Sequence, residues 1–568
     1  MAQRSDSLPW KGSVQAAGAT NFGKAGDASL AVSLSRKSTK WAVSGSVSAS
    51  RSWQTMMRQA SYSSDKMRYG HLDTSFSESR SFGEKAALSI SYRPRLHDQF
   101  VLNVKQSFSE TTRRDSTASL KLGVQSGETV LLGEGRNIEK AEREQRHYLI
   151  EAAYKHYMDK PGRSLQSEMS FSRDFSSRNT VRMLDGSLYT PKTYRITPDY
   201  EQRLSSFRLF FRDICFMDVK SLDFSAGNDL SWSMNSDIYG GATLVDAVWH
   251  DSLLLKQKYL YRSARSEPYV RASFRWRRFS FYGEERLQYF HHQLWSNLNG
   301  WDWSKSSLAG MARLEASCAL GIRHKLKWEY SRSITRPDYL QLSGLLRFGS
   351  SEGVYYLGNA DLKPTKTIRT DLTYTFSYGA WECKAQGGVS RNRNAAEQVL
   401  YTGEDKLPEQ LRESLKNAVI YSWLNTVSKN NWHLTLRLQW RKKTYEAAVW
   451  SVMNRDINKY GAAASVSTDF HYSLGCSASC LFGGGWKLSL RNTFDSQRKD
   501  VYSRVNSYLS GTVRLERGLG AWRFHAEIRE IFDKPMLRTT FSENFDYYRT
   551  ESVRYYRRLF ALGLQYDF

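Results

Sequence analysis

Apolar and polar residues alternate one by one along several long segments of this chain. The clearest segment runs from Trp432 to Trp440, where every even position is Trp or Leu and every odd position is polar. A period of two predicts a β-strand with one apolar and one polar face. Eight steps of about 3.3 Å along a strand tilted by about 45° cover roughly 19 Å of depth. We therefore expect Trp432 and Trp440 near opposite interfaces of a bilayer.

The same device recurs elsewhere, from Trp41 to Ala49, from Val270 to Trp276 and from Trp486 to Phe494. An Arg that faces lipid near the bilayer midplane costs about 2 to 4 kcal/mol. The charges therefore fix the register, and we expect Arg275 and Arg437 to face an aqueous lumen.

Turn-forming residues divide the chain into hairpins whose connections alternate between short and long, as in a membrane β-barrel. We expect short turns at 518–520, 483–485, 428–431, 378–381, 321–324, 277–278, 217–218, 159–163, 94–98 and 36–40. We expect long loops at 111–144, 235–266, 335–365, 392–412 and 532–554, with a short helix at 407–415. Between these markers lie about 22 strands, from Lys11 to Phe568, and an even number places both termini at the short-turn end.

The sequence thus predicts an all-β fold, a transmembrane antiparallel up-and-down β-barrel with long extracellular loops and short periplasmic turns. Residues 1–568 are expected to form this one domain. The composition agrees, because 40% of residues are hydrophobic, mean hydropathy is -0.58 and no stretch approaches the 18 apolar residues of a membrane helix.

The formal net charge of +25 raises the alternative of nucleic-acid binding. Basic residues are spread along the whole chain, without zinc-ligand spacing or a basic arm, so we do not expect a nucleic-acid partner. A positive rim facing lipopolysaccharide phosphates, or a lumen that attracts anions, accounts for the charge. The 5 Cys residues are scattered. Cys476 and Cys480 lie about 13 Å apart if they share a strand, too far for a disulfide.

Two passages resemble TonB-dependent receptors, an outer-membrane β-barrel family. The first contains Arg336-Pro337 and then Gly358-Asn359-Ala360-Asp361-Leu362-Lys363-Pro364, which is similar to a Gly-Asn-Pro-Asp-Leu-Lys-Pro loop of that family, with Ala360 in place of Pro. The second is the end of the chain, Phe560 to Phe568, which looks like the terminal strand of outer-membrane proteins. The resemblance implies that Tyr566 and Phe568 belong to a signal read by the barrel-assembly machinery.

The resemblance also implies a location in the cell outer membrane and a transporter that takes up a scarce ligand such as a siderophore, glycan or peptide. Members of the family begin with a signal peptide and a plug, and neither precedes Lys11 here, so we expect the TonB complex to act through a plug that this sequence does not contain. A surface lipoprotein is a further candidate partner. A plugless porin, an adhesin and a secretion pore are the alternatives.

Candidate ligand-binding residues are aromatic side chains in the expected loops and basic side chains on the expected lumen wall. They are Trp301, Trp303, Tyr355, Tyr356, Phe545, Tyr547, Tyr548, Arg437 and Arg441. Interface girdle or solvated wall is the other interpretation of the same residues.

We expect no enzyme activity, no cofactor and no metal site. A hydrolase would need His291, His292 or His433 as a base, and no Ser, His and Asp stand at recognisable spacing. His291 and His292 are adjacent, so on a strand they face opposite sides.

Overall fold

The computed structural model describes residues 10–20, 25–64, 69–95, 97–125, 128–159, 162–187, 192–217, 220–246, 248–251, 257–297, 302–342, 347–348, 354–401, 419–425, 428–460, 465–499, 503–532, 536–542, 547–555 and 559–568. Among these residues, no helix has the length and apolar character needed to span a bilayer.

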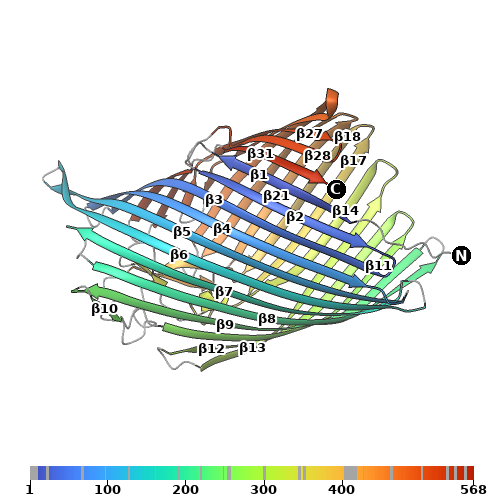
Figure 1. Ribbon diagram of the computed structural model, residues 1–568, viewed down its shortest axis with the longest axis horizontal. Coiled ribbons are helices and arrows are strands. Elements are labelled where there is room, and N and C mark those ends of the chain that lie inside the picture. Colours follow the sequence, from blue (N-terminus) through green and yellow to red (C-terminus); the bar gives the residue numbers. More distant parts are fainter. Residues whose placement is uncertain are drawn as a thin grey trace.

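The chain forms a closed antiparallel β-barrel with 22 wall strands (Figure 1). The first wall strands are β1 (Lys11–Thr20), β2 (Ala25–Lys37), β3 (Trp41–Ser64), β4 (Tyr69–Tyr92), β5 (Asp98–Gln125), β6 (Glu128–Tyr157), β7 (Ser164–Gly186), β8 (Lys192–Met217), β9 (Lys220–Val245), β11 (Gln257–Trp276) and β12 (Phe279–Ser296). The others are β13 (Asp302–Ala319), β14 (His324–Thr335), β17 (Thr365–Tyr378), β18 (Trp381–Arg393), β21 (Ser428–Lys442), β22 (Tyr445–Tyr460), β23 (Ser465–Phe482), β24 (Trp486–Asp495), β27 (Tyr508–Leu519), β28 (Trp522–Arg529) and β31 (Leu559–Asp567).

Shorter elements lie in the connections between wall strands. They are β10 (Val248–Asp251), α1 (Tyr339–Leu342), β15 (Arg347–Phe348), β16 (Val354–Tyr356), β19 (Ala396–Tyr401), β20 (Val419–Asn425), η2 (Gly483–Gly485), β25 (Arg498–Lys499), β26 (Ser503–Val505), β29 (Met536–Ser542) and β30 (Tyr547–Tyr555).

The first and last strands close the barrel. β1 pairs antiparallel with β31, and the backbone N–H groups of Gly12 and Phe568 each donate to the other residue's carbonyl, at 2.8 and 2.9 Å. Gly12 is required at this seam because a Cβ there would meet the Phe568 ring at 2.7 Å and the Ser33 carbonyl oxygen at 2.6 Å. The expected span from Lys11 to Phe568, the strand number and the placement of both ends at one rim are confirmed.

The short connections define one rim, which we call the short-turn end, and the opposite rim is the loop end. Among the described residues, eight of the expected short turns are found between wall strands, including the tight turns at Arg277, Gly379 and Gly520, where φ is positive. The turn expected at 217–218 falls between β8 and β9, and its residue 218 lies outside the described residues. The turn expected at 428–431 is wrong, because these residues belong to β21 and the turn follows at 443–444.

Because the short turn follows β21 instead of preceding it, β21 runs toward the short-turn end. Trp440, not Trp432, therefore lies at that end. Trp440 pairs there with Trp381, and their ring centroids are 6.3 Å apart. Trp41 and Tyr92 stack at 4.0 Å at the same rim. These rings form an aromatic belt of the kind that marks a membrane interface.

Strand length differs strongly around the barrel. β5 and β6 have 28 and 30 residues, whereas β14 and β18 have 12 and 13. Figure 1 shows β5 and β6 extending toward the loop end, at the left of the view. Because about 9 to 11 residues suffice to cross a bilayer, the upper parts of these hairpins lie outside it. The long loop expected at 111–144 is therefore wrong, and most of it is paired strand.

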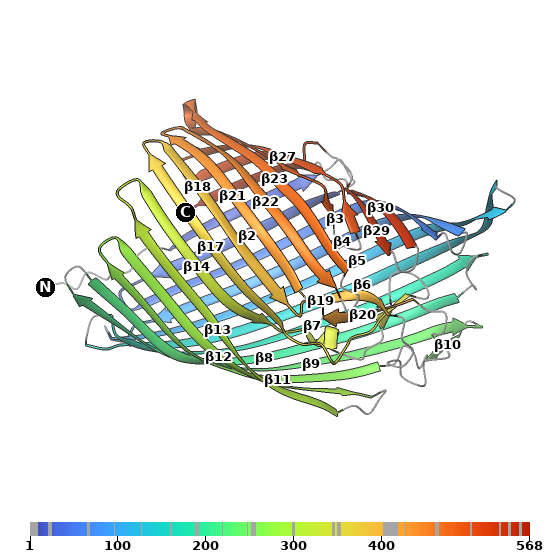
Figure 2. The same cartoon turned by 180° about the vertical axis from the view of Figure 1, so that it is seen from behind.

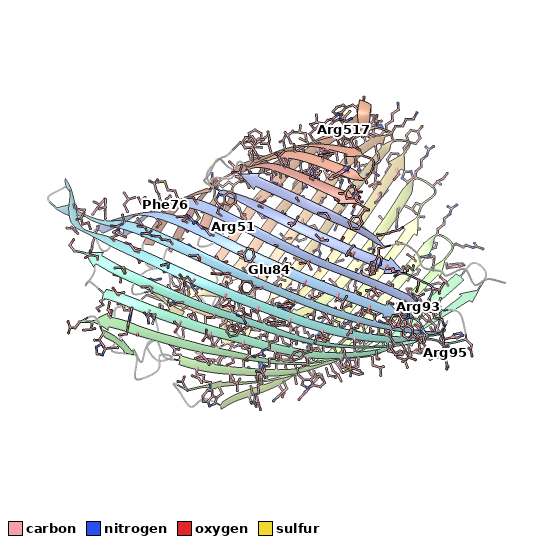
Figure 3. All side chains as sticks on the ribbon, in the orientation of Figure 1. Arg51, Phe76, Glu84, Arg93, Arg95 and Arg517 are labelled. Carbon is pink, nitrogen blue, oxygen red and sulfur yellow. The ribbon has the colours of Figure 1, made fainter. Side chains whose placement is uncertain are left out.

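Alternation fixes which face of each strand is apolar, as the sequence predicted. On β21 the even positions from Trp432 to Leu438 are 40% to 54% exposed on the outer face, while Arg437 lies opposite Lys384 and Trp450 on the inner face. On β11, Arg271 bonds Glu284 of β12 inside the barrel, so Arg275, four positions along the same strand, also faces inward. Figure 3 shows side chains on both faces, with Arg93, Arg95 and Arg517 near the short-turn rim.

Candidate functional site

Carboxylates and guanidinium groups pair across the inner wall of β8, β9, β11 and β12. Arg286 donates to Asp229 at 3.0 Å, to Glu267 at 2.9 Å and to Glu284 at 3.0 Å. Arg208 bonds the same Asp229 at 2.6 Å. Glu267 is buried, and the Arg286 guanidinium matches its charge. The network makes this side of the lumen polar and rigid.

Arg336 joins this network to the segment between β14 and β17. Its Nε donates to Gln288 at 2.8 Å and its Nη1 to Ser307 at 2.6 Å. Its Cζ lies 4.2 Å from the centroid of the Phe290 ring. Burial lowers the pKa of the Arg336 guanidinium, but this group remains charged at neutral pH. Gln288 in turn donates to Glu267, so Arg336 is one bond removed from the ionic network.

The segment 336–364 and the segment 394–427, which connects β18 to β21, fold together. We call their described parts the loop pair. β15, β16, β20 and β19 form a small sheet of four strands, in which β16 runs parallel to β20. Figure 2 shows α1, β19 and β20 within the outline of the barrel near the loop end.

Two Asn side chains hold the loop pair together. Asn359, which is 9% exposed, donates through Nδ2 to the Trp423 carbonyl at 2.8 Å and accepts the Asp361 N–H at 3.0 Å. Asn425 accepts the Lys363 N–H at 2.8 Å and donates to the Lys363 and Asn394 carbonyls at 3.0 and 2.7 Å. The motif from Gly358 to Pro364 therefore has a structural role, since Asn359 and Lys363 hydrogen-bond to a segment that is far away in sequence.

A small apolar core fixes the loop pair against the inner wall. Leu342 of α1 and Leu362 pack with Tyr259, Tyr261 and Leu294, all of them buried. The Tyr339 ring also lies against Tyr200 and Tyr261, with centroids 6.0 and 5.9 Å apart. Of the other motif residues, Gly358 is buried and Pro337 and Pro364 are half-buried. These contacts place the loop pair inside the lumen, not above it.

The expected ligand-binding residues are separated by the structure. Tyr356 lies in the loop pair and stacks on Tyr421 at 5.7 Å. Arg437 lines the lumen, and Arg441 bonds Glu446 at 3.0 Å next to the turn at 443–444, at the short-turn end. The structure thus does not bring Arg441 and Tyr356 together. Trp301, Phe545 and the helix expected at 407–415 lie outside the described residues, as do the side chains of Trp303, Tyr355, Tyr547 and Tyr548.

The three candidate histidines occupy different surroundings. His291 faces outward, 2.9 Å from the Ser306 hydroxyl, and His292 faces inward, 3.2 Å from the Tyr261 hydroxyl, so the expected opposite orientation is confirmed. His433 Nε2 lies 2.7 Å from Asp371 Oδ1, reaching across Gly388 of the intervening strand. A Cβ at Gly388 would meet that oxygen at 2.3 Å. Sequence reasoning missed this pair, because Asp371 and Gly388 give no local signal.

The terminal aromatic residues lie on the closing strand at the short-turn rim. Tyr566 packs on Trp522, with ring centroids 4.5 Å apart, and on Phe568 at 6.0 Å. Their part in assembly stays a prediction.

The family is decided by comparison with known proteins. A model of an outer membrane protein beta-barrel family matches residues 156–566, more than half of the chain. This chain belongs to the outer membrane protein beta-barrel family. Its location in the outer membrane and its barrel fold follow from that membership and from the closed barrel. No curated protein matches.

Solved structures resemble this family member in fold. The siderophore receptor PirA from Pseudomonas aeruginosa has a TM-score of 0.56 at 12% identity and the match covers 100% of this chain and 81% of the receptor. The ferric citrate transporter FecA has a TM-score of 0.65 at 9% identity, with 100% and 79% covered. The copper transporter OprC has a TM-score of 0.66 at 11% identity, with 100% and 82% covered. The expected resemblance to TonB-dependent receptor barrels is confirmed for the fold.

Proposed function

We propose that this barrel is the wall of a TonB-dependent transporter that takes up a scarce ligand across the outer membrane. The observation that carries the proposal is the loop pair, which is docked inside the lumen by Arg336 and by the core around Leu342. A folded structure held in the lumen narrows an open path and can present fixed side chains to a ligand, as a receptor requires.

The size and lining of the lumen support the same proposal. Barrels with about 22 strands that serve as outer-membrane transporters have a plugged lumen. The inner wall here carries paired charges, such as Arg286 with Asp229 and Glu267, which suit contact with water and with a polar folded plug. We propose that residues 1–568 supply the barrel domain and that the TonB complex acts on a plug inside it. The barrel-assembly machinery, lipopolysaccharide and a surface lipoprotein are the other proposed partners.

Aromatic groups of the loop pair are the proposed ligand contacts. Burial and then the nearby Tyr356 raise the pKa of Tyr421, so the Tyr421 phenol is neutral in physiological conditions. Neutral rings stack on sugar rings or on aromatic chelates. The solved barrels that resemble this fold include a siderophore receptor and a ferric citrate transporter, which makes a small chelate, glycan or peptide a reasonable cargo class.

Uptake by cells that carry or lack this protein tests the proposal. We expect accumulation of the cargo to need the protein and to stop when a protonophore removes the energy supply. We also expect the native complex to pass little current in a planar bilayer. A large current with uptake that ignores the protonophore would favour a plugless porin or secretion pore, and surface binding without uptake would favour an adhesin. We expect no hydrolysis of peptide or ester substrates by the purified barrel.

A further inference from the structure

Three metal-ligating side chains converge on the inner wall, on strands that the site described above does not use. Asp456 of β22 and Asp469 and His471 of β23 present one ligand atom each, and these atoms all lie within 4.8 Å of one another. The Nδ1 of His471 is 2.9 Å from Asp469 Oδ2 and 3.8 Å from Asp456 Oδ2. We propose that this triad binds a divalent transition-metal cation of the Zn²⁺ type.

The register explains why these side chains share one face. Asp456 lies directly opposite Asp469, and His471 lies opposite Asn454, two residues toward the short-turn end. Opposed residues of an antiparallel pair point to the same side, and so do residues two apart on one strand. Trp450, opposite the inward Arg437, has the same parity on β22 as Asp456. The triad therefore faces the lumen.

The spacing fits a metal with three protein ligands. Ligand bonds of about 2.1 Å at tetrahedral or octahedral angles place neighbouring ligand atoms about 3.0 to 3.4 Å apart. The observed separations of 2.9 and 3.8 Å bracket this range. The two carboxylate oxygens lie within 4.8 Å of each other, so a shift of up to about 1.4 Å of the Asp456 carboxylate completes the face.

Two further features favour a cation over a purely structural contact. Asp469 is only 8% exposed, and like charges placed directly opposite on neighbouring strands destabilise a sheet unless a positive charge lies between them. Asn431 of β21 donates to the outer oxygen of Asp456, Oδ1, at 2.6 Å and so directs Oδ2 toward His471. Such an outer hydrogen bond orients metal-binding carboxylates.

The donor set selects the ion. One imidazole with two carboxylates suits Zn²⁺ and its neighbours in the first transition row. Ca²⁺ and Mg²⁺ prefer six or more oxygen ligands, which this nitrogen-containing set does not offer. The inference concerns a cation held on the wall and does not depend on transport.

Titration of the refolded barrel with Zn²⁺ tests the inference. The barrel is refolded in detergent without lipopolysaccharide, treated with a chelator and dialysed, because lipopolysaccharide itself binds divalent ions. We expect one equivalent of Zn²⁺ by calorimetry, d–d absorption bands with Co²⁺, and at least tenfold weaker binding of Ca²⁺ and Mg²⁺. Asp456→Asn and His471→Gln should each weaken Zn²⁺ binding by at least about tenfold, the lower end of what loss of a supporting group costs a metal site.

His433→Asn is the matched control, because His433 and Asp371 form another inner-wall imidazole–carboxylate contact, at 2.7 Å. This variant should bind Zn²⁺ as the unaltered chain does. Resistance of each folded variant to unfolding on a gel run without heating shows that the barrel is intact. Absence of Zn²⁺ binding would leave His471 as a structural contact of the two carboxylates and overturn the inference. Equal binding by all three variants would assign the metal to other groups and overturn it as well.

Discussion

Replacing Arg336 by Ala is expected to free the loop pair from the lumen wall while the barrel stays folded. Arg336 makes its contacts with Gln288, Ser307 and Phe290, which lie on wall strands β12 and β13, whereas its own backbone belongs to the connection that follows β14. The substitution removes these contacts and leaves every wall ladder unchanged. Its effect should therefore be local.

The size of the effect follows from the geometry. Hydrogen bonds to a charged group contribute about 1.5 to 3 kcal/mol each, and a cation over an aromatic face about 0.5 to 2 kcal/mol. The side chain is half-buried, so water replaces part of the lost hydrogen-bonding free energy, and desolvation of the guanidinium already offsets part of it in the unaltered chain. A net loss of about 2 kcal/mol is a reasonable estimate, which corresponds to a roughly 30-fold larger open population.

Hydrogen exchange measures this population. The N–H of Leu357 donates to the Tyr421 carbonyl at 2.8 Å and the N–H of Asn359 to the Gln341 carbonyl at 2.6 Å. Both bonds join parts of the loop pair to one another, and we expect them to open when the loop pair leaves the wall. In Arg336→Ala their exchange should become about 30-fold faster, while amides of the β12–β13 ladder keep their rates.

Arg437→Ala is the control, because Arg437 is an inner-wall Arg on β21 whose cross-strand neighbours, Lys384 and Trp450, lie outside the loop pair. It should leave the exchange of Leu357 and Asn359 unchanged. If these amides exchange at the same rate in Arg336→Ala and in the unaltered chain, Arg336 does not anchor the loop pair and the reasoning is wrong.

Three further predictions concern the wall. Gly388→Ala should destabilise the barrel by about 1 to 3 kcal/mol, because its Cβ would meet Asp371 Oδ1 at 2.3 Å. Gly387→Ala, with a nearest contact at 3.8 Å, should be tolerated. Urea unfolding in micelles compares the two variants, and equal unfolding midpoints would contradict the assigned faces. Leu436→Arg on the outer face should cost about 2 to 4 kcal/mol in refolding into liposomes, whereas Thr435→Arg on the inner face should refold normally; equal refolding would refute the register. Phe568→Ala should lower the fraction of chains assembled in the outer membrane, and Phe568→Tyr should not. Surface labelling of whole cells measures this fraction. Unchanged assembly of both variants would show that Phe568 is not part of the assembly signal.

Much of the barrel could be predicted because a bilayer imposes a local rule. In the Trp432 to Trp440 segment every second side chain must be apolar, and that period is visible without knowledge of the partner strands. The rule fails above the bilayer, where both faces of a hairpin are wet. Residues 428–431 are polar for that reason, and their composition led to the wrong prediction of a turn. They are strand residues that pair with β18 on one side and β22 on the other.

The site was less predictable because its contacts join distant parts of the chain. The motif residues Arg336 and Asn359 were identified by resemblance, yet their partners Gln288 and Trp423 lie 48 and 64 positions away and carry no local mark. The Asp371 and His433 contact depends on a Gly in the strand between them. Only the register, which the sequence does not display, brings such groups together.

The most direct test of the account is the accessibility of single cysteines placed at each position from 432 to 440, in a chain whose native Cys residues are replaced. After reconstitution into lipid, a membrane-impermeant thiol reagent should label the odd positions, which line the lumen. A quencher dissolved in the hydrocarbon should affect fluorophores at the even positions. Labelling that fails to alternate, or equal access from water at all positions, would contradict a wall whose neighbouring side chains face lipid and lumen in turn.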